Sequence, residues 1–152
     1  MPAQTTHVEI VATITGHGFG KDNANCAEFC DHEHHYSLVH NGITNTAYEW
    51  HPIVYSSEGC ENEVNSGVVA NQFGSWPFGR AGWCAGQDVK QWRYNITSWL
   101  DLSRAGDTSY NYSLDYRGLY NGQEYVPSDG IGNGGRQIRA VIYVVFYTSI
   151  SS

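Results

Sequence analysis

Short segments that alternate polar and apolar residues, separated by turn residues, recur along the chain and constrain the fold most. The segment from His7 to Ile14 alternates in this way, which is typical of a strand with one buried face. Asn41-Gly42 directly follows another such segment and is a strong signal for a tight hairpin turn. Further segments of strand length are 35–40, 46–50, 53–55, 89–96, 108–116 and 137–147. We therefore expect about seven to nine strands in an antiparallel β-sandwich that forms a single domain over residues 1–152.

The composition supports an all-β domain and argues against several classes of function. Seventeen glycines, eleven tyrosines and five tryptophans among 152 residues favour turns and strands over helices. Only eight Lys and Arg residues and a formal net charge of −7 argue against an electrostatic surface for nucleic acid. No apolar run reaches the roughly 20 residues that a membrane span needs, and the N-terminal residues lack the pattern of a signal peptide.

The four cysteines allow three disulfide pairings. Cys26 and Cys30 are close enough in sequence to close a small loop. Cys60 and Cys84 bracket a longer, Gly- and Ser-rich loop that we expect to be ordered. We expect these two pairs, which imply an oxidising compartment and thus a secreted, periplasmic or extracellular protein. The alternative is a metal site built from Cys26, Cys30 and the histidines that follow them.

Polar and aromatic residues beside the cysteines form the main candidate site. Glu28 lies between Cys26 and Cys30, so its carboxylate would have a fixed direction, suited to acid–base chemistry or to a hydrogen bond with a sugar or amide. His17 lies in a Gly-His-Gly turn that leaves its ring accessible. The alternatives from spacing alone are a surface glutamate in a tight loop and a turn histidine without a functional role.

Arg80 and Trp83 lie in the motif Gly79-Arg80-Ala81-Gly82-Trp83-Cys84. A planar guanidinium binds hydroxyls or amide oxygens through two hydrogen bonds, and an indole offers an apolar face to a sugar ring. Simple packing of Trp83 onto the disulfide is the alternative interpretation.

Three motifs in this order, the Gly-His-Gly turn at His17, the segment Cys26–Cys30 and the segment Gly79–Cys84, resemble those of the C-terminal domain of the peptide-N-glycosidase F family. Members of that family remove N-linked glycans from asparagine. The resemblance implies the jelly-roll form of the sandwich, an architecture shared with the copper-dependent peptidylglycine hydroxylating monooxygenases. It also agrees with the disulfide pairs Cys26–Cys30 and Cys60–Cys84.

The resemblance further implies which residues line a cleft between two domains of such an enzyme. Glu28 would be the catalytic candidate, and His17, Arg80 and Trp83 would bind the ligand. Phe29 would also bind the ligand, at a position where the family enzyme has a tryptophan that lines the glycan site, and this difference weakens stacking on a sugar.

The family's main catalytic aspartate and a supporting glutamate belong, by the same resemblance, to a preceding domain. Nothing precedes Met1 in this sequence, so we expect the chain alone to bind rather than to hydrolyse. A second jelly-roll domain is the partner that would complete the active site.

A second candidate site is the histidine-rich segment from Asp31 to His35. On a strand, His32 and His34 point to the same face, and such a pair is a common way to present two imidazoles to copper or zinc. A third ligand would come from His17, Asp31 or His51. The alternative is a solvated polar cluster beside a disulfide.

Together these observations favour a secreted module that recognises a glycan or glycopeptide and requires no cofactor. The first alternative is part of a peptide-N-glycosidase-type amidase completed by another domain. The second is a module that binds copper or zinc through His32 and His34, and the third is a structural or adhesive domain without a ligand.

Overall fold

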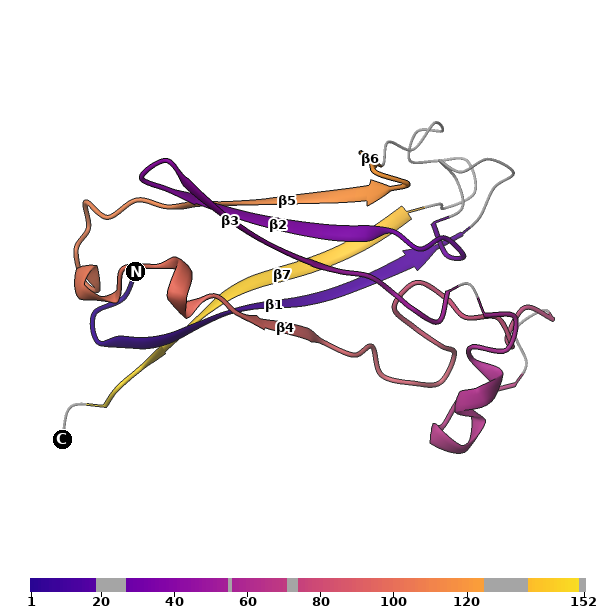
Figure 1. The fold of residues 1–152 in the computed structure, drawn as a ribbon. Helices are drawn as coiled ribbons and strands as arrows, with labels where there is room; N and C mark the ends of the chain where they lie inside the picture. The colour runs from indigo at the N-terminus through magenta and orange to yellow at the C-terminus, as the bar shows by residue number, and fades with distance from the viewer. Residues whose placement is uncertain (19–26, 55, 71–73, 125–136, 151–152) are drawn as a thin grey trace.

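The structure is a computed structural model that describes residues 1–18, 27–54, 56–70, 74–124 and 137–150. These residues form two antiparallel sheets with almost no helix, which confirms the expected all-β sandwich. The strands are β1 (Thr5–His17), β2 (Glu33–His40), β3 (Ile43–Glu49), β4 (Trp92–Asn95), β5 (Ser113–Tyr120), β6 (Gln123–Glu124) and β7 (Gln137–Thr148). One sheet has the order β4-β1-β7 and the other β3-β2-β5-β6, and Figure 1 shows them as two layers.

The hairpin predicted at Asn41-Gly42 is confirmed. Asn41 has a φ of 50° and Gly42 a φ of 77°, the pair of positive values that a type I′ turn requires. The turn joins β2 to β3, with His40 opposite Ile43 and His34 opposite Glu49. This register places His34, Tyr36 and Glu49 on the face of the sheet that is turned toward the core.

The core lies between the sheets and follows the alternation of the sequence. Val8, Ile10, Ala12 and Ile14 point inward from β1, and they pack with residues from the opposite sheet and from the loop after β4. The remaining buried members of this cluster are Tyr36, Leu38, Ile96, Leu100 and Tyr110. Burial of this apolar surface is the main stabilising contribution to the fold.

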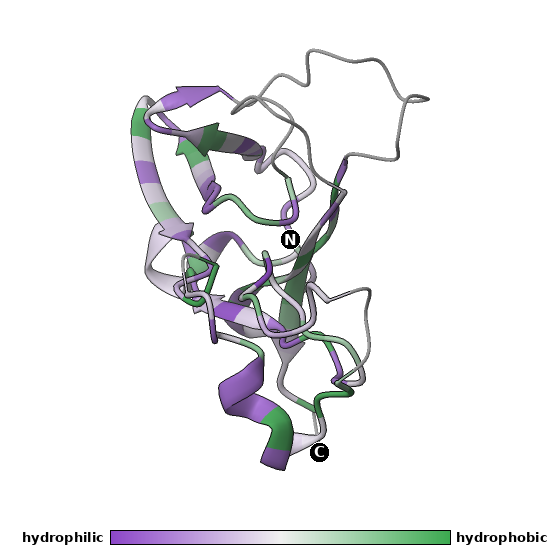
Figure 2. Ribbon diagram, turned by 90° about the vertical axis from the view of Figure 1, so that its right-hand side faces the viewer, coloured by the Kyte–Doolittle hydropathy of each residue, from purple (hydrophilic) through white to green (hydrophobic). Residues whose placement is uncertain are grey.

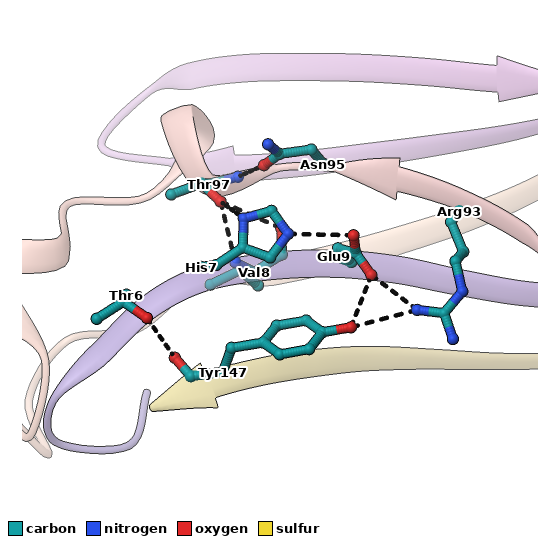
Figure 3. A network of polar contacts seen from close by, with 8 residues as sticks. All are labelled: Thr6, His7, Val8, Glu9, Arg93, Asn95, Thr97 and Tyr147. Atoms are coloured by element: carbon teal, nitrogen blue, oxygen red, sulfur yellow. Dashed lines mark hydrogen bonds and ion pairs between the residues drawn. The ribbon is translucent and has the colours of Figure 1, made fainter. Parts of the chain in front are cut away.

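The outer face of β1 carries a polar network that ties together the three strands of its sheet (Figure 3). Glu9 Oε2 accepts hydrogen bonds from Arg93 of β4 and from the hydroxyl of Tyr147 of β7, each at 2.9 Å. His7 Nε2 contacts Glu9 Oε1 at 3.1 Å, and the other ring nitrogen contacts the Thr97 hydroxyl at 3.1 Å. Such exposed pairs contribute modestly to stability, but here they also link strands that are distant in sequence.

Several local predictions were wrong in position. The segment 53–54 forms a turn rather than a strand, with the Val54 N–H bonded to the His51 carbonyl at 3.1 Å. The strand predicted at 108–116 begins at Ser113. The loop 60–86 contains a short 3-10 helix, η2 (Glu61–Ser66), which has no buried residue and is largely hydrophilic (Figure 2). Two shorter 3-10 helices, η3 (Thr97–Trp99) and η4 (Leu102–Arg104), follow β4.

The described parts of the segments that carry His17, Glu28 and Arg80 lie at one end of the sandwich, opposite the N-terminus (Figure 1). The predicted Cys60–Cys84 disulfide is confirmed and holds the long loop closed. The Cys26–Cys30 prediction involves Cys26, which lies outside the described residues. In the described part of the chain, no helix is long and apolar enough to cross a membrane.

Candidate functional site

Three backbone segments meet where the candidate site forms. The Gly16 N–H at the end of β1 donates to the Ala81 carbonyl at 2.9 Å, and the Ala81 N–H donates to the Glu28 carbonyl at 2.8 Å. The Glu28 N–H returns to the Gly18 carbonyl at 2.9 Å. A Cβ atom on Gly16 would lie 2.0 Å from the Ala27 carbonyl oxygen, so only glycine allows this approach. These bonds form a backbone braid of β1, the 27–30 turn and the 79–84 loop.

The braid places the carboxylate of Glu28 against the guanidinium of Arg80. Glu28 Oε1 lies 2.7 Å from Arg80 Nε, and Glu28 Oε2 accepts a hydrogen bond from the Gly18 N–H at 2.9 Å. The Arg80 side chain is 2% exposed and that of Glu28 is 15% exposed. A carboxylate with one partner on each oxygen has a fixed direction while its edge remains open to solvent.

Arg80 is fixed by further contacts on its other side. Its Nη2 donates to the carbonyl and hydroxyl oxygens of Ser75 at 3.2 and 3.1 Å. Its Cζ atom lies 4.6 Å from the ring centre of Trp83 and 5.8 Å from that of Phe29, within the range of cation–π attraction. The guanidinium therefore holds the carboxylate and both aromatic rings in one arrangement.

Trp83 and His17 are half-buried members of the same group. The Trp83 indole N–H donates to the Gly16 carbonyl at 2.7 Å, so the ring is oriented by the backbone of β1. The rings of His17 and Trp83 have centres 5.3 Å apart. His17 Nε2 contacts the Thr15 hydroxyl at 2.9 Å, and burial, followed by the positive charge of Arg139, lowers the pKa of His17. A neutral imidazole is thus favoured at neutral pH.

The structure brings together the five residues that the motifs singled out: His17, Glu28, Phe29, Arg80 and Trp83. Phe29 also contacts Phe78 edge-on, with ring centres 6.3 Å apart. The arrangement combines a fixed carboxylate, a buried cation and aromatic surfaces, which are groups that hold hydroxyl- or amide-bearing ligands. Their roles as binding or catalytic residues stay predictions.

The histidines of the second candidate site are buried rather than solvated. His32 and His34 are almost fully buried, and the rings of His34 and His51 lie edge to face with centres 5.2 Å apart. His34 Nδ1 contacts the Tyr116 hydroxyl at 2.9 Å. Burial lowers the pKa of His32 and His51 to about 4 and that of His34 to about 3. The interpretation as a solvated polar cluster is wrong.

A metal at this cluster receives no support from the geometry. Within the residues that the structure describes, no group of three or more His, Cys, Asp or Glu side chains is arranged to hold a metal ion. Asp31 accepts a hydrogen bond from the backbone N–H of His51 at 3.2 Å, and His17 contacts Trp83 in the other site. The third ligand expected beside His32 and His34 is therefore not found among them.

A buried acid missed by the sequence analysis, Glu49, lies at the end of β3, opposite His34 of β2. The Tyr36 hydroxyl donates to Glu49 Oε1 at 2.7 Å. Burial raises the pKa of Glu49 to about 7, an effect that the Tyr36 hydrogen bond partly opposes. Burial and the neighbouring carboxylate raise the pKa of Tyr36 far above its usual value. The Asn41-Gly42 turn contained the signal for this pair, because its register places Tyr36 and Glu49 on one face.

Comparison with known proteins gives one family and several similar structures. A family model described as "Peptide-N-glycosidase F, C terminal" matches residues 1–127. A solved structure of recombinant peptide:N-glycanase F is 25% identical, with a TM-score of 0.57, over 95% of this chain and 39% of that chain. A search of curated proteins found no match.

Two further solved structures show the same fold. One is the glycosylasparaginase PNGase F from Flavobacterium meningosepticum, 22% identical with a TM-score of 0.55 over 95% of this chain and 40% of that chain. The other is a peptide-N(4)-(N-acetyl-β-D-glucosaminyl) asparagine amidase, 22% identical with a TM-score of 0.59 over 100% of this chain and 43% of that chain. The chain thus spans about two-fifths of the solved chains it matches.

Proposed function

Because the chain belongs to the peptide-N-glycosidase F C-terminal family, we propose that it recognises glycans or glycopeptides through Glu28, Arg80, Trp83 and His17. The observation that carries this proposal is the contact series from Glu28 to Arg80 to Trp83 to His17, which holds polar and aromatic groups together without a ligand. Such a preformed arrangement lowers the entropy cost of binding. The Cys60–Cys84 disulfide supports the proposal of a secreted protein.

The second candidate function is a share in amide hydrolysis. The printed names of the similar structures include an asparagine amidase, and the chain corresponds to about two-fifths of those chains. In this proposal a further jelly-roll domain supplies additional carboxylates, and Glu28 contributes from this side of a shared cleft. Glu28 would then act on the substrate as a held carboxylate, oriented by Arg80 and the Gly18 N–H.

A titration with N,N′-diacetylchitobiose tests the binding proposal. We expect a dissociation constant in the millimolar range, which corresponds to about 4 kcal/mol. Glu28→Gln keeps the shape of the side chain and removes the charge, so we expect binding about tenfold weaker. Trp83→Ala removes the aromatic surface and should weaken binding by a similar factor.

The matched control is Tyr143→Ala, since Tyr143 is an exposed aromatic residue on β7. Circular dichroism confirms that each variant is folded before its affinity is compared. Equal affinities of the native chain and Glu28→Gln, with both folded, would contradict the proposed site.

A further inference from the structure

A separate cavity of about 290 Å³ opens beside the candidate site and shares one residue with it, Trp83. Its wall also includes Glu49 at the end of β3, Trp50 just after it and Trp92 at the start of β4. We call it the Trp50–Trp92 cavity. Gly82, His51 and further carboxyl and amide side chains, Glu63, Gln87, Asp88 and Gln91, are also part of the wall.

The carboxyl group of Glu49 in this wall is held in place by Tyr36. Glu49 is 7% exposed, and the Tyr36 hydroxyl holds its Oε1 at 2.7 Å. The Tyr36 ring is stacked on Trp92 with centres 4.9 Å apart, so the acid and the indole are supported by the same residue. Burial brings the pKa of Glu49 close to neutrality, which is typical of carboxyl groups in ligand sites.

The aromatic side chains of the wall are positioned independently of any ligand. Trp50 is 49% exposed and stacks on Tyr48 with centres 5.5 Å apart. The indole N–H of Trp83 is already bonded to the Gly16 carbonyl, so Trp83 offers apolar ring surface to the cavity. Gly82, with a φ of 82°, allows the close approach of the Ile14 carbonyl and the His51 ring.

The mixture of groups indicates the class of ligand. The wall combines three indoles with carboxyl and amide side chains, groups that bind the apolar faces and the hydroxyl groups of a sugar. The volume is near the lower end of the roughly 300–1,000 Å³ typical of small-molecule sites, so it suits one ring rather than a long chain.

We propose that the Trp50–Trp92 cavity is a second sugar subsite, which takes one pyranose ring between Trp50 and Trp92 with its hydroxyls bonded to Glu49. This inference rests on the proposed glycan recognition, because Trp83 joins the cavity to the Glu28–Arg80 site. A glycan of several sugars would then contact both sites across Trp83.

Indole N–H resonances distinguish the two sites, because Trp50 and Trp92 line only the cavity whereas Trp83 lines both sites. The ¹⁵N-labelled chain, with Trp50, Trp83 and Trp92 assigned, is titrated at pH 8 with N-acetylglucosamine and with N,N′-diacetylchitobiose up to tens of millimolar. We expect the resonances of Trp50 and Trp92 to shift together with that of Trp83. Trp50→Ala should weaken chitobiose binding about fivefold, and Glu49→Gln, which keeps the acceptor for Tyr36, should weaken it by a similar factor.

The control is again Tyr143→Ala, which should bind as the native chain does. If only Trp83 shifts and Trp50→Ala binds normally, the second subsite is wrong and the proposed function stands. If Trp50 and Trp92 shift while Glu28→Gln binds normally, the subsite is supported and the Glu28–Arg80 site is wrong. If no indole shifts with either sugar, both are wrong.

Discussion

At the scale of single residues, the buried histidines have the clearest consequence for stability. His32, His34 and His51 have pKa values lowered by burial to between about 3 and 4. Below pH 6.5 the unfolded chain therefore binds more protons than the folded chain, and stability decreases as the pH is lowered. Each histidine contributes a slope of roughly 1.4 kcal/mol per pH unit until the pH reaches its folded pKa. Glu49, whose pKa is raised, contributes a slope of the opposite sign between about pH 7 and pH 4.5. This slope cancels that of about one histidine.

We predict that His34→Gln has a shallower loss of stability with acid than the native chain. Its slope between pH 6 and pH 4.5 should be smaller by roughly 1.4 kcal/mol per pH unit, because one depressed titration has been removed. Urea unfolding at several pH values measures the slope. The matched control is His35→Gln, one residue away on the more exposed face of β2. Identical slopes in the two variants would contradict the lowered pKa of His34.

At the scale of elements, Gly42 in the β2–β3 turn and Gly79 in the 79–84 loop should differ sharply in their tolerance of substitution by alanine. Gly42 has a φ of 77° and no atom within 4 Å of an added Cβ, so Gly42→Ala costs only the left-handed conformation, about 1 kcal/mol. On Gly79, a Cβ would lie 1.6 Å from the Ile53 carbonyl oxygen. Gly79→Ala must displace backbone next to Arg80, so we expect a loss of about 3 kcal/mol and weaker chitobiose binding. Thermal unfolding and the same titration check both, and equal losses would show that the close packing at Gly79 is unimportant.

The elements also show what the sequence could predict. The Asn41-Gly42 hairpin was predictable because its turn residues act locally. The strand predicted at 108–116 was misplaced because its alternation has another cause. Asp107 accepts the Ser109 N–H at 2.8 Å, and the Tyr110 hydroxyl accepts the Asp101 N–H at 2.8 Å, so the aromatic residues there pack a loop onto the core. A β5–β6 hairpin was missed, although Asn121-Gly122 carries the same turn signal as Asn41-Gly42.

The candidate site was only partly predictable for a physical reason. The motifs identified Glu28 and Arg80 as site residues, but their ion pair depends on loops distant in sequence that meet through β1. The pairing of Tyr36 with Glu49 was predictable from the register of the β2–β3 hairpin. The burial that raises the pKa of Glu49 was not, because it also depends on the opposite sheet.

At the scale of the whole molecule, the chain corresponds to about two-fifths of the similar solved chains. Amide hydrolysis needs a group that activates the nucleophile and others that stabilise the developing charge, and the loss of one of them removes most of the rate. We therefore predict that these 152 residues alone release no detectable N-glycan from a denatured glycoprotein, although they bind chitobiose. Mass spectrometry of released glycans measures this. Release that disappears in Glu28→Gln would instead show that the chain holds a complete active site.

The backbone braid between Gly16, Glu28 and Ala81 also determines where the chain can change in length. An insertion or deletion in the 27–30 turn or the 79–84 loop would shift the donors and acceptors of the braid out of register and separate the carboxylate from the guanidinium. Substitutions at positions other than the close-packed glycines, such as Gly16 and Gly79, leave those bonds in place. We therefore expect the lengths of these two loops to be more tightly constrained than the identities of their half-buried side chains, such as Phe29.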